Sequence, residues 1–226
     1  MLKKLLLTLF ACAVVAVMPL KAQSKLPKLP MDIQQPAIIY AYDALCGWCY
    51  GFSPVMANFY EAQKGKYNFY VLSGGMVTGE RIGPIGTVAP YIKKAYKDVE
   101  RGTGIVFGEG FLNNILEPGK AVFSSLKPGY ALTALKKEKP ELAMAFSKRL
   151  QKAVYSDGIL VDEWDSYKLL AVEFGLDPEQ FIKAMKSPEI QAETEKEFAV
   201  CSQLGVTGFP TVFLIKDNKM YRIAEG

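Results

Sequence analysis

The sequence predicts an α/β domain into which a large helical block is inserted. Strand-like segments lie near both ends of the chain, at 37–42, 67–72 and 211–215. Between them, from about Thr78 to Leu204, apolar residues follow helical spacing, and Gly and Pro residues separate the predicted helices. With 226 residues, half of them apolar and 22% charged, the chain is globular, and its length fits one large domain or a small domain that carries an insertion.

The first half of the α/β domain is predicted as a β-α-β unit. Ala37 to Tyr42 is a short strand, and Gly51 to Ala62 carries apolar residues at three- and four-residue spacing, which indicates a helix. Pro54 predicts a kink within that helix. A second strand, Tyr67 to Leu72, stops at Ser73-Gly74-Gly75. We expect the two strands to be parallel.

The middle block is predicted to be helical, and further strands are predicted after it. Helical spacing recurs around 142–154, 164–174, 181–185 and 190–204, whereas 102–119 is Gly-rich and predicts a loop with one short helix. Thr211 to Ile215 is a continuous apolar run, typical of a buried strand. Met220 to Ile223 would pair back with it as a hairpin.

The first 22 residues predict a secretory signal peptide. A basic start at Met1–Lys4 precedes an apolar run from Leu5 to Leu20, and Ala22 precedes polar residues, so we expect cleavage after Ala22. The run is short for a membrane span of about 20 residues, which disfavours a retained anchor. Lipidation at Cys12 is the other alternative, but the apolar run continues for eight residues beyond it. The expected location is the periplasm or another exported compartment, without stable membrane insertion of the mature chain.

Removal of residues 1–22 changes the charge and the cysteine count. The formal charge falls from +4 to +1, which argues against nucleic-acid binding, and 204 residues remain. The segment 23–36, rich in Lys, Pro and Gln, is predicted as a leader with nothing to bury. Three cysteines remain, Cys46, Cys49 and Cys201, which is too few for a disulfide scaffold. One close pair and one odd thiol in an exported protein suggest chemistry.

The close pair, Cys46-Gly47-Trp48-Cys49, follows a strand and opens a helix. Unpaired backbone N–H groups and the positive end of the helix dipole stabilise an anion at that place, so we expect a lowered pKa for Cys46. A thiolate is the nucleophile of thiol–disulfide exchange, and Cys49, one turn further in, can attack the resulting mixed disulfide. Cys46 and Cys49 are therefore the candidate catalytic residues.

Other interpretations of the pair are weaker. The chain contains no histidine and no second C-x-x-C, so it cannot assemble the four ligands of a zinc site, and imidazole-based catalysis is excluded. A structural disulfide of this span would close a very short loop and stabilise little. Chance spacing is the third alternative. No metal and no cofactor are predicted.

A second signal lies at Val206 to Phe213, where Pro210 directly precedes an apolar strand. Proline there disturbs strand pairing, and a cis Phe209–Pro210 bond would resolve the conflict. A trans proline at the start of a strand would be the plainer interpretation if the cysteine pair were absent.

Together these segments resemble the thioredoxin fold of DsbA-like thiol:disulfide oxidoreductases. The motif from Tyr42 to Gly51, YDALCGWCYG, is similar to a branch often called predicted disulfide isomerases. The resemblance covers about 37–226 and implies a thioredoxin fold with a large all-helical insertion. The thioredoxin-like domain would comprise 37–77 and 206–226, and the inserted helical domain 78–205. The resemblance also implies that Pro210 is cis against the two sulfur atoms and that Phe209 offers backbone groups to a substrate peptide.

Two departures from the family pattern are visible. The best-known members have a histidine between the cysteines, whereas this chain has Gly47-Trp48, so we expect a less stabilised thiolate and a weaker oxidant. The family fold also normally adds a helix after the final hairpin, which residues up to Gly226 do not supply.

Two further residues and the inserted block each allow two interpretations. Cys201 follows an apolar spacing, which favours a buried inert thiol over a third redox thiol. Asp43 is either a turn residue or, less favoured, a proton acceptor for Cys49. The inserted block is expected to cap the thiol pair, leaving a groove lined by Trp48 and Phe209 that binds substrate, whereas a cap that only adds core is the alternative.

The leading functional hypothesis is an exported thiol:disulfide oxidoreductase or disulfide isomerase. Its partners would be substrate proteins with free thiols or disulfides and an unidentified redox partner. One alternative is a glutathione-dependent isomerase of the 2-hydroxychromene-2-carboxylate isomerase type, which has no need of the second thiol, Cys49. The other is a non-catalytic binding protein of the cell envelope.

Overall fold

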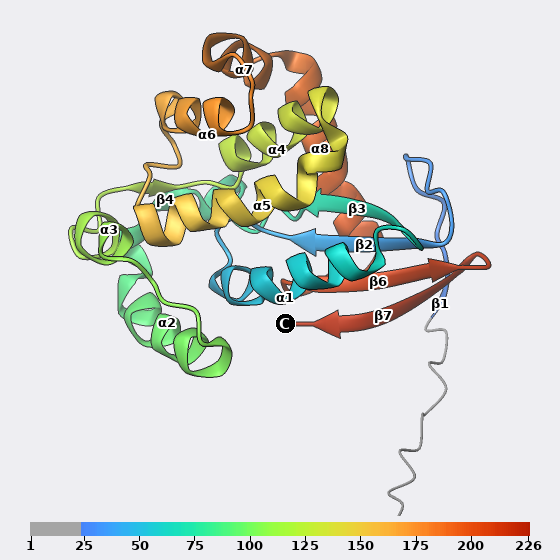
Figure 1. Ribbon diagram of the computed structural model, residues 1–226. Coiled ribbons are helices and arrows are strands. Elements are labelled where there is room, and N and C mark those ends of the chain that lie inside the picture. The colour runs from blue at the N-terminus through green and yellow to red at the C-terminus, as the bar shows by residue number, and fades with distance from the viewer. Residues whose placement is uncertain (1–23) are drawn as a thin grey trace, which may run out of the picture.

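A five-stranded sheet forms the base of the molecule, as the computed structural model shows for the residues that it describes, 24–226 (Figure 1). The strand order is β1-β7-β6-β2-β3, and only the pair β2–β3 is parallel. The bounds are β1 Ser24–Lys25, β2 Ala37–Tyr42, β3 Asn68–Ser73, β6 Thr211–Lys216 and β7 Lys219–Glu225. The predicted strands, the parallel pair and the C-terminal hairpin are confirmed. With them the thioredoxin fold is confirmed.

Helix α1, Gly47–Gln63, crosses one face of this sheet, and Cys46 is its N-cap residue. The whole Gly47-Trp48-Cys49 segment is therefore helical, which confirms that the cysteine pair opens the helix. Pro54 lies inside the helix.

The block between β3 and β6 is mostly helical. Its longer helices are α2 Ala89–Thr103, α4 Leu126–Glu138, α5 Ala143–Lys152, α6 Lys168–Glu173, α7 Pro178–Met185 and α8 Pro188–Gln203. Shorter turns are η1 Gly79–Arg81, η2 Ile85–Thr87, α3 Glu109–Phe111, η3 Leu112–Leu116, η4 Pro140–Leu142, η5 Ala153–Asp157 and η6 Trp164–Tyr167. The inserted block is not all-helical as predicted: β4, Gly83–Pro84, pairs with β5, Val122–Phe123, as a two-stranded antiparallel ribbon.

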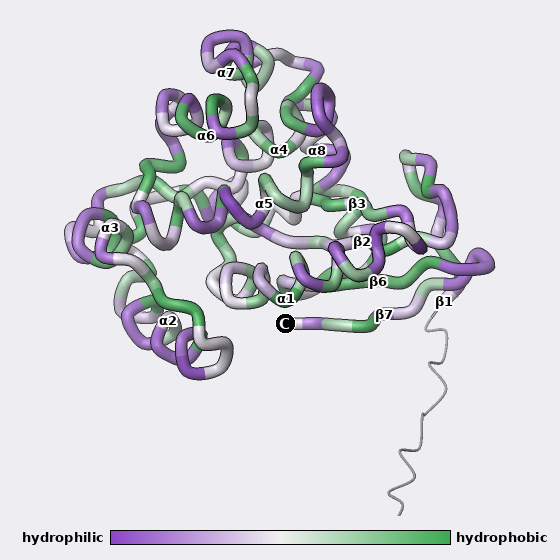
Figure 2. The backbone as a smooth tube through the Cα atoms, in the orientation of Figure 1, coloured by the Kyte–Doolittle hydropathy of each residue, from purple (hydrophilic) through white to green (hydrophobic). Residues whose placement is uncertain are grey.

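Both faces of the sheet are covered, which is why all six residues of β2 are buried. Ile38, Tyr40 and Tyr42 share a core with α1 and with helices of the inserted block. Ala37, Ile39 and Ala41 point to the opposite face, where they pack against the last turns of α8. In Figure 2 the central strand β6 is largely hydrophobic, whereas the peripheral helices α2 and α7 are largely hydrophilic. The block is thus fused to the sheet by a continuous core, and the boundary at 205/206 stays a prediction.

The segment 23–36 differs from the sequence expectation. Ser24 and Lys25 form β1 against the first residues of β7, and four apolar side chains after them pack on the core of one sheet face: Leu26, Leu29, Met31 and Ile33. The prediction of a leader with nothing to bury is therefore wrong. Its few apolar residues are irregularly spaced, so a periodicity argument does not detect them, yet they pack on the core of one sheet face.

The predicted signal peptide, with Cys12, lies outside the described residues. Across 24–226, none of the helices combines the length and the apolar character that a bilayer crossing would require.

Candidate functional site

The cysteine pair lies where β2 gives way to α1. After Tyr42 the chain turns through Asp43, and the Cys46 amide donates to the Asp43 carbonyl oxygen at 3.1 Å. Cys46 has extended backbone angles, φ −91° and ψ 114°, and its own carbonyl accepts the first helical hydrogen bond, from Tyr50 N at 3.1 Å. The Cys46 side chain therefore sits at the N-terminus of α1, as the spacing predicts.

The two thiols are buried to different degrees, and their pKa values are shifted in opposite directions. Cys46 is 7% exposed and Cys49 is fully buried, and both are free thiols. A hydrogen bond from the Cys49 side chain is the largest cause that lowers the pKa of Cys46, and amide hydrogen bonds from Cys49 and Trp48 add to it. Burial raises the pKa of Cys49 well above its ordinary value. The pair thus holds one thiol prone to ionise and one kept protonated.

The loop before β6 closes over the pair from the other end of the chain. The Phe209–Pro210 peptide bond is cis, which confirms the expectation for Pro210. The Cys46 thiol lies 3.2 Å from the Phe209 carbonyl oxygen and donates to it. The Phe209 ring covers Gly74, where an added Cβ would lie only 2.1 Å from ring atom Cε1. Gly74 therefore leaves the space that this ring occupies.

Asp43 ties three segments together beneath the thiols. Its Oδ1 accepts hydrogen bonds from Leu45 N and from the Ser125 hydroxyl, both at 2.9 Å, and its Oδ2 accepts from Met76 N at 2.8 Å. Burial raises the pKa of this carboxyl, and the donors partly offset that effect. The arrangement supports the reading of Asp43 as a turn residue, because its hydrogen bonds go to the backbone and to Ser125.

Two side chains of the inserted block hold the same turn, and sequence reasoning missed both. Tyr155, in η5, donates its hydroxyl to the Leu45 carbonyl oxygen. Gln151, in α5, is fully buried, and its amide lies 3.4 Å from the Asp43 carbonyl oxygen. In the orientation that satisfies both ends of the amide, Gln151 donates to Cys49 O at 3.3 Å and accepts from Tyr50 N at 3.0 Å. The signal available in the sequence was a polar residue adjoining the apolar stripe of α5.

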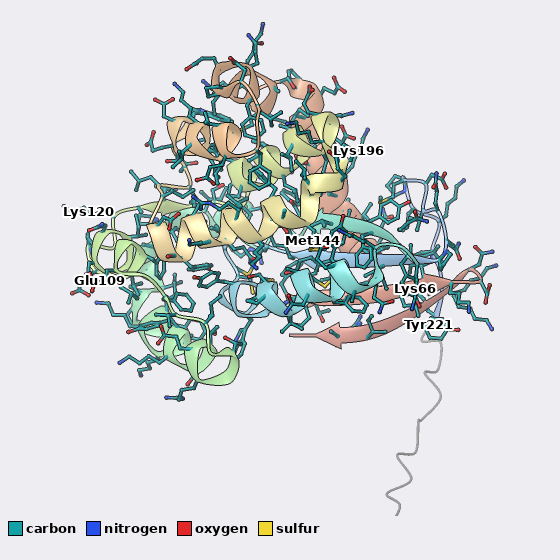
Figure 3. All side chains as sticks on the ribbon, in the orientation of Figure 1. Lys66, Glu109, Lys120, Met144, Lys196 and Tyr221 are labelled. Carbon is teal, nitrogen blue, oxygen red and sulfur yellow. The ribbon has the colours of Figure 1, made fainter. Side chains whose placement is uncertain are left out.

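The block caps the pair, as connectivity predicts. The Phe107 ring lies 3.5 Å from where a Cβ on Gly47 would stand, and Trp48 packs along Gly102 at the end of α2. Figure 3 shows side chains filling the space between α1, α5 and the sheet, with labelled charged residues such as Glu109 and Lys120 pointing outward.

A mainly apolar hollow of about 510 Å³ opens beside Cys46, between the cysteine turn and α2. Its wall includes Leu45, Trp48, Tyr91, Tyr96 and Phe107, with Arg81 among the polar residues. Trp48 is 44% exposed and Tyr91 71%. Phe209 lines a separate, smaller hollow near Gly74 and Thr207, whereas Trp48 and Pro210 together line another. A single groove lined by Trp48 and Phe209 therefore stays a prediction.

A model of the DSBA-like thioredoxin domain matches residues 37–224. The chain belongs to this family. The comparison with curated protein sequences gives no significant match.

Solved structures of other proteins resemble this DSBA-like chain closely. A candidate protein disulfide isomerase from Nitrosomonas europaea is 25% identical, with a TM-score of 0.75, and the match covers 85% of this chain and 91% of that one. The cytosolic disulfide reductase DsbM from Pseudomonas aeruginosa is 29% identical, with a TM-score of 0.72, covering 83% and 89%. 2-Hydroxychromene-2-carboxylate isomerase, 15% identical with a TM-score of 0.58 and covering 82% and 87%, shares the fold.

The third thiol of this DSBA-like chain stands apart from the pair. Cys201 is 2% exposed in the last turn of α8, and its sulfur lies 3.5 Å from the Ser73 carbonyl oxygen. Burial raises its pKa to about 12. The predicted buried position is confirmed. Within 24–226 no group of His, Cys, Asp and Glu side chains is arranged to hold a metal ion.

Proposed function

We propose that the protein is a thiol:disulfide oxidoreductase that exchanges disulfides with cysteines of substrate proteins through Cys46 and Cys49. One observation carries the proposal: the Cys46 thiol sits at the N-terminus of α1 and also against the Phe209 carbonyl of the cis-proline loop. The helix end favours the thiolate, and the loop offers backbone groups to an extended peptide. The family membership supports this chemistry.

In the reducing direction, the Cys46 thiolate attacks one sulfur of a substrate disulfide. A Cys46–substrate disulfide forms, the substrate S–S bond breaks, and the departing sulfur takes a proton. Cys49 then loses its proton and attacks the Cys46 sulfur, so the substrate leaves as a dithiol and the protein retains a Cys46–Cys49 disulfide. Two electrons pass to the substrate. The reverse sequence oxidises a substrate dithiol, and a separate dithiol or disulfide partner resets the pair.

The surroundings of Cys46 suit an unfolded protein segment. Trp48 and the hollow behind it offer apolar surface directly beside the thiol, and a hollow of about 510 Å³ holds one or two large side chains. Phe209 and Pro210 would align the substrate backbone on the other side of the sulfur. We expect apolar residues next to the reacting cysteine to improve binding.

The test is reduction of insulin by dithiothreitol in the presence of the purified protein. We expect the wild-type protein to accelerate precipitation of the insulin B chain and Cys46→Ser to return the rate to that without enzyme. Cys201→Ala serves as the matched control, since it also removes one buried thiol, and should retain the wild-type rate. A Cys46→Ser protein that remains folded and active would refute the proposal, and a non-catalytic binding protein would show no acceleration at all.

Glutathione is a second candidate partner, because one DsbM structure, 28% identical with a TM-score of 0.70, is described as containing it. Mass spectrometry after incubation with oxidised glutathione would show an adduct on Cys46 if glutathione resets the pair. A Cys49→Ser variant should accumulate that adduct, because it lacks the thiol that resolves it.

We also propose export, on the basis of the basic start and apolar run within residues 1–22. The mature protein isolated from its native cells should then begin at Gln23. An intact N-terminus in the cytosolic fraction would contradict export and match the location printed for DsbM.

A further inference from the structure

The active-site turn is held by side chains from a part of the chain that a minimal thioredoxin unit does not contain. Gln151 and Tyr155 lie four residues apart, one at the end of α5 and one in η5, and therefore share a helix face. Tyr155 donates to the Leu45 carbonyl, and Gln151 bonds to the first turn of α1 at Cys49 O and Tyr50 N. Both contacts lie next to the reacting sulfur along the backbone.

We propose that Gln151 and Tyr155 are positioning residues that fix the backbone around Cys46 and keep its thiol reactive. The inference rests on the proposed role of Cys46 as the attacking thiol. Both side chains are almost wholly buried, so their hydrogen bonds do not compete with bulk water. Their contacts bracket the cysteine, with Leu45 directly before it and Cys49 three residues after it.

The Tyr155 hydroxyl has a direct electrostatic consequence. It offsets part of the negative end of the carbonyl dipole of Leu45, the residue directly before Cys46. Its ring is fixed independently, stacked on Tyr50 with centroids 5.4 Å apart and edge-on to Phe107 and Phe111 at 5.1 and 5.0 Å. Removing the hydroxyl alone should therefore leave the ring in place and free the carbonyl.

The contribution of Gln151 is geometric. The helix N-terminus stabilises a thiolate only if its first amides point at the sulfur, and Gln151 holds the first turn from the side opposite the solvent. The titratable groups facing Cys46 are few: Cys49 on its own helix, Asp43 and Tyr40 from β2 and its end, and Tyr155 itself. None of them is a cation, so the causes that lower the pKa of Cys46 are hydrogen bonds, which burial and the Asp43 charge oppose.

The experiment compares Tyr155→Phe and Gln151→Met with the wild type in the reduced, full mature protein. The readouts are thiolate absorbance near 240 nm against pH and the rate of Cys46 alkylation by iodoacetamide below its pKa. We expect both variants to raise the pKa of Cys46 and slow alkylation about three- to tenfold, which corresponds to about half to one pKa unit. Cys49→Ser versions of each protein assign the absorbance to Cys46.

Tyr167→Phe is the matched control. Tyr167 is also fully buried and donates its hydroxyl to a backbone carbonyl, that of Val161 at 2.7 Å, but this hydrogen bond involves no backbone group of the cysteine turn. It should alter thermal stability without altering the titration of Cys46. The proposal is overturned if folded Tyr155→Phe and Gln151→Met titrate like the wild type, or if Tyr167→Phe shifts the titration equally. The titration and alkylation of Cys46 use no substrate. A wild type that is inactive on insulin would therefore refute the proposed function, while the comparison of Cys46 pKa values between the variants would still test this proposal.

Discussion

Cys46 and Cys201 are both buried thiols, on opposite faces of the same sheet, yet their environments point to opposite chemistry. Cys46 caps the N-terminus of α1, and its pKa is lowered by the Cys49 side chain and by the first amides of the helix. Cys201 lies in the last turn of α8, close to the Ser73 carbonyl oxygen, and burial raises its pKa to about 12. Exposure barely separates them, at 7% and 2%.

The difference teaches that hydrogen-bond donors, more than exposure, separate the two buried thiols. Cys46 receives hydrogen bonds from the Cys49 side chain and from the first amides of α1, whereas Cys201 faces the Ser73 carbonyl oxygen and burial is the largest cause of its raised pKa. Four changes would break or sharpen this contrast.

The largest effect should appear in the alkylation of the native, reduced protein at neutral pH. With a pKa of about 12, three units above the ordinary 9.0, Cys201 holds about a thousandth of the thiolate of an ordinary cysteine. We therefore expect Cys46 to react more than about 10³-fold faster than Cys201, as measured by timed quenching and peptide mass spectrometry. In urea the three thiols should react at similar rates. Comparable native rates for Cys46 and Cys201 would remove the contrast.

Replacement of Asp43 by Ala should remove the hydrogen bonds that hold the cysteine turn around Cys46. It leaves Leu45 N, Met76 N and the Ser125 hydroxyl buried without their acceptor, at about 1–3 kcal/mol for each unsatisfied group, partly recovered by relaxation. We expect a loss of about 2–4 kcal/mol in the free energy of unfolding by urea. Asp177→Ala, which removes the exposed N-cap acceptor of α7 from Gln180 N, should cost only about 1 kcal/mol. Equal losses would show that Asp43 is an ordinary cap.

The pH dependence of stability should isolate Cys201. Because its folded pKa is raised, its contribution is fully present below the unfolded value near 9.0 and is lost as pH rises toward about 12. Between pH 9 and 10.5 the reduced wild type should lose about 2 kcal/mol that Cys201→Ala does not lose, at about 1.36 kcal/mol per pH unit. Urea midpoints of both proteins at the two pH values give the loss of stability in each. Both proteins contain Cys46 and Cys49, so the contribution of these thiols cancels when the two losses are subtracted. Parallel curves would mean that Cys201 titrates normally.

The smallest effect should follow from Gly74→Ala. Its Cβ would stand 2.1 Å from Phe209, so the ring and the adjoining carbonyl that faces Cys46 must shift. We expect a cost of about 1–2 kcal/mol in unfolding free energy, together with slower insulin reduction. Gly65→Ala, where nothing lies within 4 Å of the added methyl, is the control. It should change the unfolding free energy by no more than about 0.5 kcal/mol and leave the rate of insulin reduction unchanged. Unchanged activity in Gly74→Ala would indicate that the position of Phe209 is not critical.

The local features of the site could be predicted from the sequence because each depends on short-range chemistry. The strand before Cys46, the helix after it and the apolar run after Pro210 are visible as patterns, and their combination identifies the thioredoxin fold. The position of Cys201 also followed from spacing, since Ile190, Phe198 and Leu204 mark one apolar face of α8.

The long-range features could not be predicted, because they join polar residues to distant backbone groups. Nothing in the composition around Gln151 or Tyr155 indicates a contact with the cysteine turn more than 100 residues earlier. The separate hollows beside Trp48 and Phe209 could not be predicted for the same reason, since the position of the Phe209 ring depends on Gly74. The packing of Leu26 and Met31 depends on a core that includes Met220 and is complete only after the C-terminal hairpin has formed.

The contact between Cys46 and Phe209 spans 163 positions of the chain. During synthesis at about 5–20 residues per second, both cysteines therefore leave the ribosome roughly 10–30 s before the loop that faces them. The cysteine turn also emerges before α5, so neither Gln151 nor Tyr155 is then present to hold it. Loop closure over such a distance is among the entropically costly steps of folding. Until the loop and the inserted helices have packed over the cysteine turn, the Cys49 thiol lacks the burial that raises its pKa.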